Sequence, residues 1–443
     1  MTGIQDSVDK TVNYISRSIT LKIMAIGILI LLLLIPAVMI QNLIRERQHR
    51  RDSVITEINR KWGGSQTVTG PFITVPFKSF YKDRNGETQF NFKYLHILPE
   101  TLSITGEINP EVRYRSLFET IVYDAKLKFD GNFKMPQSSR LNIEPENIIW
   151  EKAYLSVGIT DMRGIEDKID VKFNESVRKT NPGLKTKDIA PSGVSTQVDL
   201  SSDNEAKTFS FDLNLKGSDR IAFIPAGELT RVNIKANWPS PSFDGAFLPE
   251  KREMKEGGFS AAWKILHLNR NYPQFWEGRQ YEVLSSSFGV KLILTADIYQ
   301  KSMRLAKYSI MFLLFTFASF FFSEVINKQK IHPIQYMLVG IAILIFYTLV
   351  LSLSEHIGFN NAYILSAASV TLIISGYAKA IVASKQFACT IMGILALLYG
   401  YLFIVLQLED YALIMGSLGL LVITATVMFM TRKINWYKIE AAK

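Results

Sequence analysis

The sequence contains almost no cysteine: one residue, Cys389, among 443, and it stands inside an apolar run near the C-terminus. A single cysteine excludes an intramolecular disulfide and leaves no cluster of thiolates for a metal ion. The long polar region of the chain must therefore be stable through its own hydrophobic core.

Catalytic motifs are lacking as well. There is no Gly-x-Ser-x-Gly, no phosphate-binding loop, and no Gly-x-Gly-x-x-Gly beside a predicted strand. The polar region has three histidines, His49, His96 and His267, without a second ligand at helical or hairpin spacing, which argues against a zinc site. We therefore expect a protein that is not an enzyme, holds no cofactor or metal, and has no nucleic-acid partner.

Charge is nearly absent from six apolar runs, each long enough to cross a bilayer as a helix. Lys307 is the only charged residue in them, and they cover residues 23–40, 306–323, 336–353, 362–378, 387–406 and 411–430. The runs have no polar stripe, which argues against buried helices of a soluble domain. The first run is longer than the core of a signal peptide and has no small-x-small cleavage site, so it predicts an uncleaved anchor. The lack of ionisable groups at mid-bilayer depth disfavours pumping.

The short loops between these runs predict the orientation, because lysine and arginine accumulate on the cytoplasmic side. Two loops and the tail are basic, with Lys328, Lys330, Lys379, Lys385, Arg432, Lys433, Lys438 and Lys443. The other two loops contain Glu355, His356, Glu409 and Asp410 and no lysine or arginine. We therefore predict that both termini are cytoplasmic and that the large polar domain is periplasmic.

The residues between the first two runs predict strands. Alternating runs cover residues 69–81, 88–94, 125–133, 153–159, 208–215, 230–238 and 290–298, and Asn85-Gly86 predicts a hairpin turn between the first two. Residues 178–203 are polar and predict a mobile loop. The predicted fold is α+β: an antiparallel β-sandwich-type periplasmic domain and a bundle of six transmembrane helices. The predicted parts are a cytoplasmic N-terminus (1–22), an anchor helix (23–40), the periplasmic domain (41–305), helices 2–6 (306–430) and a cytoplasmic tail (431–443).

Two polar clusters lie next to the predicted membrane. Arg45, Arg47, Arg50 and Arg51 follow the first run, and they predict either a solvated helix end, the favoured interpretation, or contact with anionic headgroups. Ser354, Glu355 and His356 end the third run, where a polar cap or a docking point for the outer domain is favoured. A hydrolase that used Ser354 and His356 would need a carboxylate such as Glu355 or Asp410 to converge with them, but a serine and a histidine two residues apart on a helix face different directions.

Several segments carry a resemblance to a known family. They are Leu34-Ile35-Pro36, Gly70-Pro71, Leu98-Pro99-Glu100, Asp161-Met162-Arg163-Gly164, Asn237-Trp238-Pro239-Ser240-Pro241-Ser242-Phe243, Phe247-Leu248-Pro249-Glu250-Lys251-Arg252, His332-Pro333-Ile334-Gln335-Tyr336, Leu353-Ser354-Glu355-His356, Gly358-Phe359 and Asn435-Trp436-Tyr437. With them the chain resembles the CreD family of bacterial inner-membrane proteins, which is associated with cell envelope integrity. The resemblance implies an inner-membrane location, one anchor followed by a periplasmic domain, and a compact membrane bundle. It supplies no catalytic residue.

The candidate interaction residues are Trp238, Phe243, Phe247, Lys251, Arg252, Glu355 and His356. The aromatic loop predicts packing across the sandwich, and the alternative is docking on lipid headgroups, the membrane bundle or a partner protein. The predicted function is that of a non-enzymatic envelope protein whose β-domain binds a protein, lipid or glycan and supports envelope integrity or a stress response. The alternative is a lipid-handling protein or transporter with an apolar pocket between the helices and the β-domain.

Overall fold

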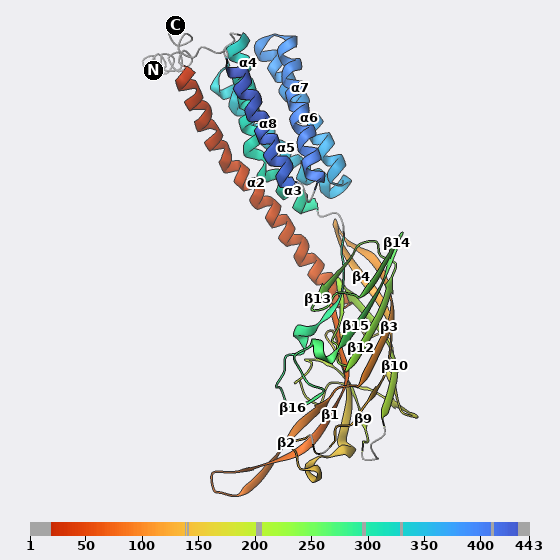
Figure 1. Ribbon diagram of the computed structural model, residues 1–443. Helices are drawn as coiled ribbons and strands as arrows, with labels where there is room; N and C mark the ends of the chain where they lie inside the picture. The colour runs from red at the N-terminus through yellow and green to blue at the C-terminus, as the bar shows by residue number, and fades with distance from the viewer. Residues whose placement is uncertain are drawn as a thin grey trace. The chain divides into compact units, whose positions relative to one another are not determined.

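The protein is α+β, with apolar helices and two mixed sheets, in a computed structural model that describes residues 19–137, 139, 141–200, 206–294, 298–327, 331–408 and 412–432 (Figure 1). The chain divides into two compact units: residues 1–51 with 296–443, called here the helical unit, and residues 52–295, called the β unit. Most of the N-terminus, Lys328, Lys330, Glu409, Asp410 and the tail after residue 432 lie outside the described residues. The predicted orientation therefore stays a prediction.

The apolar runs form helices, as expected. Their bounds are α2 (Ile19–Trp62), α3 (Ile298–Lys307), α4 (Ser309–Asn327), α5 (Pro333–Ile357), α6 (Phe359–Val382), α7 (Lys385–Gln407) and α8 (Ala412–Thr431). Proline at the first position is a sequence signal for a helix start, and α5 begins at His332-Pro333: the His332 ring accepts a hydrogen bond from Ile334 N, and Pro333 occupies the first turn, where no N–H partner is needed. Gly358, at φ 77°, ends the same helix.

The number of membrane spans is partly supported. Among the described residues, α2, α5, α6 and α7 are long and apolar enough to cross a bilayer, and α3 with α4, bent by 44°, makes a fifth if the pair is one span. The sixth expected span coincides with α8, and the count of six stays a prediction. The first helix is longer than the expected anchor: residues 41–62, assigned to the β-rich domain from sequence, continue α2.

Two sheets form the β unit within the described residues. The first runs β13 (Pro241–Gly245), β17 (Phe288–Leu292), β11 (Arg220–Phe223), β1 (Gln66–Lys82), β5 (Ala153–Ile159), β9 (Gly193–Val198) and β8 (Asn181–Pro182); β2 (Thr88–Ile97) pairs with β1, and β16 (Phe275–Glu277) with β2. The second runs β14 (Lys251–Lys255), β15 (Gly258–Leu266), β12 (Leu229–Ala236), β3 (Thr101–Arg115), β4 (Phe118–Phe133), β10 (Lys207–Ser218), β6 (Asp170–Phe173) and β7 (Ser176–Lys179).

The prediction of purely antiparallel sheets was wrong. β1 pairs parallel to β11 and β12 pairs parallel to β3, so each sheet is mixed. Alternation within a strand indicates which side chains are buried but not the direction of the neighbouring strand, since that direction depends on long connections. The mobile loop expected at residues 178–203 contains the end of β7 and all of β8 and β9. The strand expected at 290–298 ends at Leu292.

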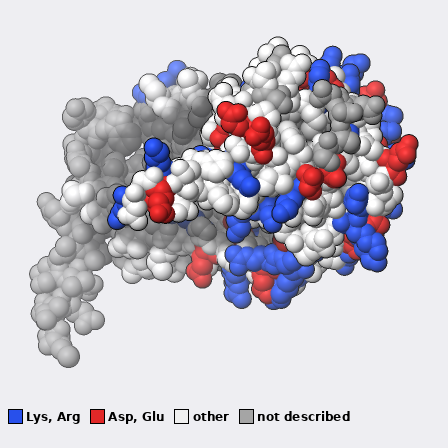
Figure 2. Space-filling view, turned by 90° about the horizontal axis from the view of Figure 1, so that it is seen from below, with Lys and Arg blue, Asp and Glu red and all other residues white. Residues whose placement is uncertain are grey.

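One apolar core lies between the two sheets and holds the β unit together. Alternation along the strands builds this core, as β12 illustrates: Thr230, Val232, Ile234 and Ala236 are buried and alternate with exposed residues. Trp263 of β15 lies with its ring 5.7 Å from that of Phe288 in β17, so side chains of the two sheets interdigitate. In the view of Figure 2, basic and acidic side chains are interspersed over the surface rather than separated by sign.

Candidate functional site

The aromatic loop between β12 and β14 packs on the core. Phe243 makes edge-to-face contacts with Phe259 and Trp263, at ring distances of 5.6 and 5.8 Å. Phe247 lies 6.0 Å from Phe288, and Trp238 donates from Nε1 to Ile293 O at 3.2 Å. All three aromatic side chains are only partly buried. Packing on the core therefore explains why one face of each ring is buried. Docking of a partner on the remaining exposed surface stays a prediction.

Lys251 and Arg252 lie on β14, at the edge of the second sheet. All five residues of β14 are exposed, and the strand pairs only with β15 among the described residues. The preceding loop presents Leu248, whose side chain is 72% exposed. Charged side chains on an edge strand protect it from pairing with other chains, which is a sufficient structural role for both residues.

Glu355 has protein partners within the helical unit, which the sequence did not indicate. One carboxylate oxygen accepts a hydrogen bond from the Tyr299 hydroxyl at 2.9 Å, and the other lies 3.9 Å from the guanidinium of Arg47. Arg51 lies over the Tyr299 ring, 5.2 Å from its centre. Two of the four arginines after the first apolar run therefore contact this cluster of α2, α3 and α5, rather than only solvent or headgroups. A polar cap for α5 fits this arrangement.

Ser354 and His356 point to different surroundings. The Ser354 side chain is buried and its hydroxyl donates to Leu351 O at 2.9 Å, whereas His356 is exposed. Glu355 is held by Tyr299. Nothing in the described residues joins the three into a nucleophile, base and orienting acid, and Asp410 lies outside those residues.

The C-terminal end of α2 and the residues after it contact two segments of the β unit. We call residues 59–66, 161–164 and 216 together the junction. Two cations lie close to the Trp62 ring: Arg113 is 4.8 Å and Lys216 4.9 Å from its centre. Asp161 accepts a hydrogen bond from Gly64 N at 3.0 Å. Hydrogen bonds from the Arg163 side chain, with the Gly64 amide, hold the pKa of Asp161 at about 2, so the carboxylate stays charged.

Gln66 is the central side chain of this junction. It is fully buried, its amide donates to the carbonyl oxygens of Asp161 and Lys216, both at 2.9 Å, and its oxygen accepts from Asp161 N at 3.1 Å. Gly164 leaves the space that this network needs, because a Cβ there would lie 2.2 Å from Lys216 O and 2.5 Å from the Gln66 amide nitrogen. The segment Asp161-Met162-Arg163-Gly164 thus holds residues 64–66, which connect α2 to β1.

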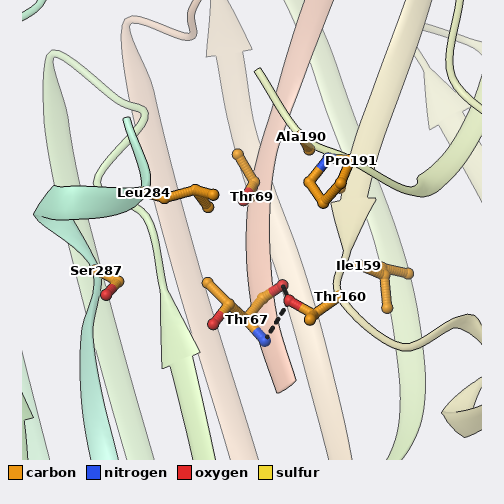
Figure 3. A pocket seen from close by; sticks show the side chains of 9 residues that line it. Thr67, Thr69, Ile159, Thr160, Ala190, Pro191, Leu284 and Ser287 are labelled. Carbon is orange, nitrogen blue, oxygen red and sulfur yellow. Dashed lines mark hydrogen bonds between the residues drawn. The ribbon is translucent and has the colours of Figure 1, made fainter. Parts of the chain in front are cut away.

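A small cavity lies beside this junction (Figure 3). Its volume is about 260 Å³, and its lining comes from β1, the end of β5 with Thr160, residues 190–191, and Leu284 and Ser287. Thr160 links two sides of it, since its hydroxyl accepts from Thr67 N and donates to Thr67 O, each at 3.2 Å. The lining carries threonine and serine hydroxyls but no charged side chain. The lining is mainly apolar with a few hydroxyl groups, and it offers no acid or base for catalysis.

His96 belongs to a buried network rather than to a metal site. Its Nε2 lies 3.0 Å from Asp188 and its Nδ1 3.2 Å from the Thr74 hydroxyl, and the rings of Phe72 and Trp276 pack around it. Burial lowers the pKa of His96, partly offset by Asp188. Within the described residues no three histidine, cysteine, aspartate or glutamate side chains are placed to hold a metal ion.

This network gives the β unit a dependence on pH. The folded state binds a proton at His96 less readily than the unfolded chain, so stability is complete above the unfolded pKa of about 6.5 and decreases as the pH falls below it. We expect His96→Gln to flatten the decrease of the melting temperature between neutral and mildly acid pH. His267→Gln, at a half-exposed histidine whose Nδ1 lies 3.9 Å from Glu228, is the control and should change the slope less than His96→Gln; equal slopes in all three proteins would refute the role of His96.

The helical unit contains a buried ion pair that the sequence did not indicate. Lys22 of α2 pairs with Glu324 of α4, and both side chains are 9% exposed. Glu324 also accepts hydrogen bonds from Tyr336 OH at 3.0 Å and Ile331 N at 3.1 Å, and Lys22 donates to Ile331 O at 3.0 Å. The one feature of the sequence that could have indicated this pair is position: Lys22 and Glu324 each lie next to the end of a predicted apolar run.

These features define a class: an α+β membrane protein in which one long helix contributes to both an apolar helical unit and a unit of two mixed sheets. The family model for the inner membrane protein CreD matches residues 18–437. The chain is 32% identical over 426 residues to the inner membrane protein CreD of Escherichia coli K12, covering 94% of this chain and 93% of that protein. It belongs to the CreD family, which supports an inner-membrane location.

A solved structure from Parabacteroides distasonis, described as a candidate protease, shows a weaker likeness. It is 9% identical, covers 67% of this chain and 58% of its own, and has a TM-score of 0.24. A likeness at that level carries no argument about fold or activity.

Proposed function

We propose that the protein is a non-enzymatic component of the inner membrane whose β unit lies in the periplasm, binds a protein, lipid or glycan, and supports envelope integrity. Family membership supports the membrane location. The observation that carries the proposal is that α2 makes specific contacts in both units: Arg47 and Arg51 contact Glu355 and Tyr299 in the helical unit, and Arg113 and Lys216 contact the Trp62 ring in the β unit.

This anchoring suits transmission better than simple tethering. A flexible tether needs no specific contacts at its ends, and a Gly- and Ser-rich linker would serve. Here charged and aromatic side chains hold one helix at two places, at Arg47 and Arg51 and again at Trp62, and the Gly64 amide is fixed by Asp161. We propose that ligand binding to the β unit changes which of these contacts form, and that this change is transmitted through α2 to the helices around Glu355. A change of this kind needs a ligand that binds one arrangement better than the other.

The test is photocrosslinking in intact cells. A photoreactive residue is placed in turn at Trp238, Phe247 and Lys251, with Val177 as the control, since Val177 is 66% exposed on a strand that carries no candidate residue. We expect discrete adducts of one protein, lipid or glycan at the candidate positions that are absent at Val177. Equal, diffuse adducts at all positions would contradict binding at this loop.

A further probe at His356, which is exposed at the end of α5, separates the two functions. Lipid adducts both at the loop and at His356 would favour a lipid-handling protein. Adducts confined to the loop would favour a sensor or scaffold.

A further inference from the structure

The hairpin of β1 and β2 extends beyond the rest of its sheet, at the lower end of the β unit in Figure 1. Residues 78–93 are almost entirely exposed. β5 pairs with β1 only up to Thr74, and β16 pairs with β2 only from Leu95 onward. Within the described residues, the outer hairpin is therefore a two-stranded ribbon without a third strand on either side.

The register places the aromatic side chains on one face of this ribbon. Phe80 lies opposite Phe90, Lys78 opposite Phe92, and Lys82 opposite Thr88. Residues directly opposite each other in an antiparallel pair point to the same side, and alternate residues of a strand share a side. One face thus carries Phe80, Phe90 and Phe92 with Lys78 and Lys82, and we call it the aromatic hairpin face. Tyr81 lies on the other face.

The three rings form one contiguous surface. The Phe80 and Phe90 rings are 6.1 Å apart, and the Phe90 and Phe92 rings 5.7 Å. Lys78 lies 5.6 Å from the centre of the Phe90 ring. Each ring is nevertheless half exposed. Packing within the ribbon does not account for such exposure, and contiguous exposed apolar surface is typical of an interaction site.

The charge on this face determines the kind of partner. Its only charged side chains are the two lysines, while Asp83, the next residue along the chain, accepts hydrogen bonds from the amides of Asn85 and Glu87 at 2.9 Å and so belongs to the turn. In the turn itself Arg84 and Glu87 are both exposed, and their charges offset each other. An apolar surface with cations at its border is complementary to a layer that is apolar inside and anionic at its surface.

We propose that the aromatic hairpin face binds the surface of a bilayer that contains anionic phospholipids. Aromatic rings partition into the interfacial layer, where their faces leave water, and lysines extend toward headgroup phosphates. A narrow ribbon can insert its rings without displacing the sheets behind it. The aromatic hairpin face is distinct from the aromatic loop, and its binding to a bilayer surface does not depend on which side of the membrane the β unit occupies.

Full-length protein in nanodiscs of phosphatidylcholine alone, mixed with separate vesicles, provides the test. Vesicles of equal parts phosphatidylcholine and phosphatidylglycerol should carry the protein in a flotation assay, and vesicles of phosphatidylcholine alone should carry far less. Phe80→Ser with Phe90→Ser should weaken binding at least about 10-fold. Lys78→Gln with Lys82→Gln should weaken it roughly 25-fold at low salt.

Tyr81→Ser is the matched control, because Tyr81 is 52% exposed and Phe80 54%, on opposite faces of the same strand. It should leave binding unchanged. An equal loss on Tyr81→Ser, equal binding to neutral vesicles, or self-association that depends on the same phenylalanines would each overturn the proposal.

A second readout does not depend on the stability of a multiple variant. In a Cys389→Ala background, which has no other cysteine, an environment-sensitive fluorophore is attached to a cysteine at position 90 or 81. Anionic vesicles should shift the emission of the label in Phe90→Cys to the blue and leave that in Tyr81→Cys unchanged. The same shift at both positions would contradict insertion by one face.

Discussion

Glu324→Gln is expected to lower the stability of the helical unit by about 3–5 kcal/mol. Glu324 is 9% exposed, and its carboxylate receives Lys22, Tyr336 OH and Ile331 N. Removing its charge leaves the Lys22 ammonium buried without a counter-ion, and this desolvation cost exceeds the loss of the hydrogen bonds alone. The measurement is the apparent melting temperature of purified full-length protein in detergent, where residues of the helical unit should become accessible to protease at lower temperature.

Replacing both charged residues distinguishes the loss of the ion pair from the cost of leaving one buried charge without a counter-ion. Lys22→Met with Glu324→Leu removes both ions at once, so we expect it to recover most of the stability lost in the single variant. Lys61→Gln is the control, because Lys61 pairs with Glu57 on the same helix α2 but is 71% exposed. It should cost less than about 1 kcal/mol. Effects of equal size at Glu324 and Lys61 would show that the buried pair does not stabilise the helices.

Gly164→Ala is expected to destabilise the β unit by about 1–3 kcal/mol. The new Cβ would lie 2.2 Å from Lys216 O, a backbone atom held in β10, and 2.5 Å from the Gln66 amide. Neither can move without breaking the hydrogen bonds that join Gln66, Asp161 and Lys216. At about 2–4 °C per kcal/mol for a unit of this size, the melting temperature should fall measurably.

Gly64→Ala tests whether the effect comes from space rather than from the loss of a glycine. Gly64 lies in the same junction, but a Cβ there would meet its nearest atom, an Asp161 carboxylate oxygen, at an ordinary 3.5 Å. Its amide still donates to Asp161. We expect a change of less than about 1 kcal/mol. A larger effect at Gly64 than at Gly164 would contradict the arrangement described for this junction.

The sequence predicted local features well where one short-range cause decides them. The Asn85-Gly86 hairpin forms, with β1 ending at Lys82 and β2 starting at Thr88, and only Gly86 of that pair has a positive φ. The strand predicted at 153–159 coincides with β5. The starting signal at His332-Pro333 is equally local. Each of these depends on turn chemistry or alternation within a few residues.

The candidate site was predicted less well, because its contacts join residues far apart in the sequence. Glu355 was identified, but Tyr299 as its partner was not. The arginines after the first apolar run were taken for a solvated helix end, whereas α2 continues to Trp62 and two of them contact α3 and α5. No short-range pattern distinguishes an arginine that faces water from one that faces a carboxylate on another helix.

The sequence by itself determined that apolar helices accompany a separate β-rich part, since uncharged runs of membrane length and alternating strands are properties of composition and period. Only the tertiary structure decided the parallel pairings, the contacts of Asp161 and Gly164 with the residues that follow α2, and the buried ion pair of Lys22 with Glu324. The physical reason is that these features depend on which distant segments meet. That choice is made by packing the whole apolar core, and local propensity does not encode it.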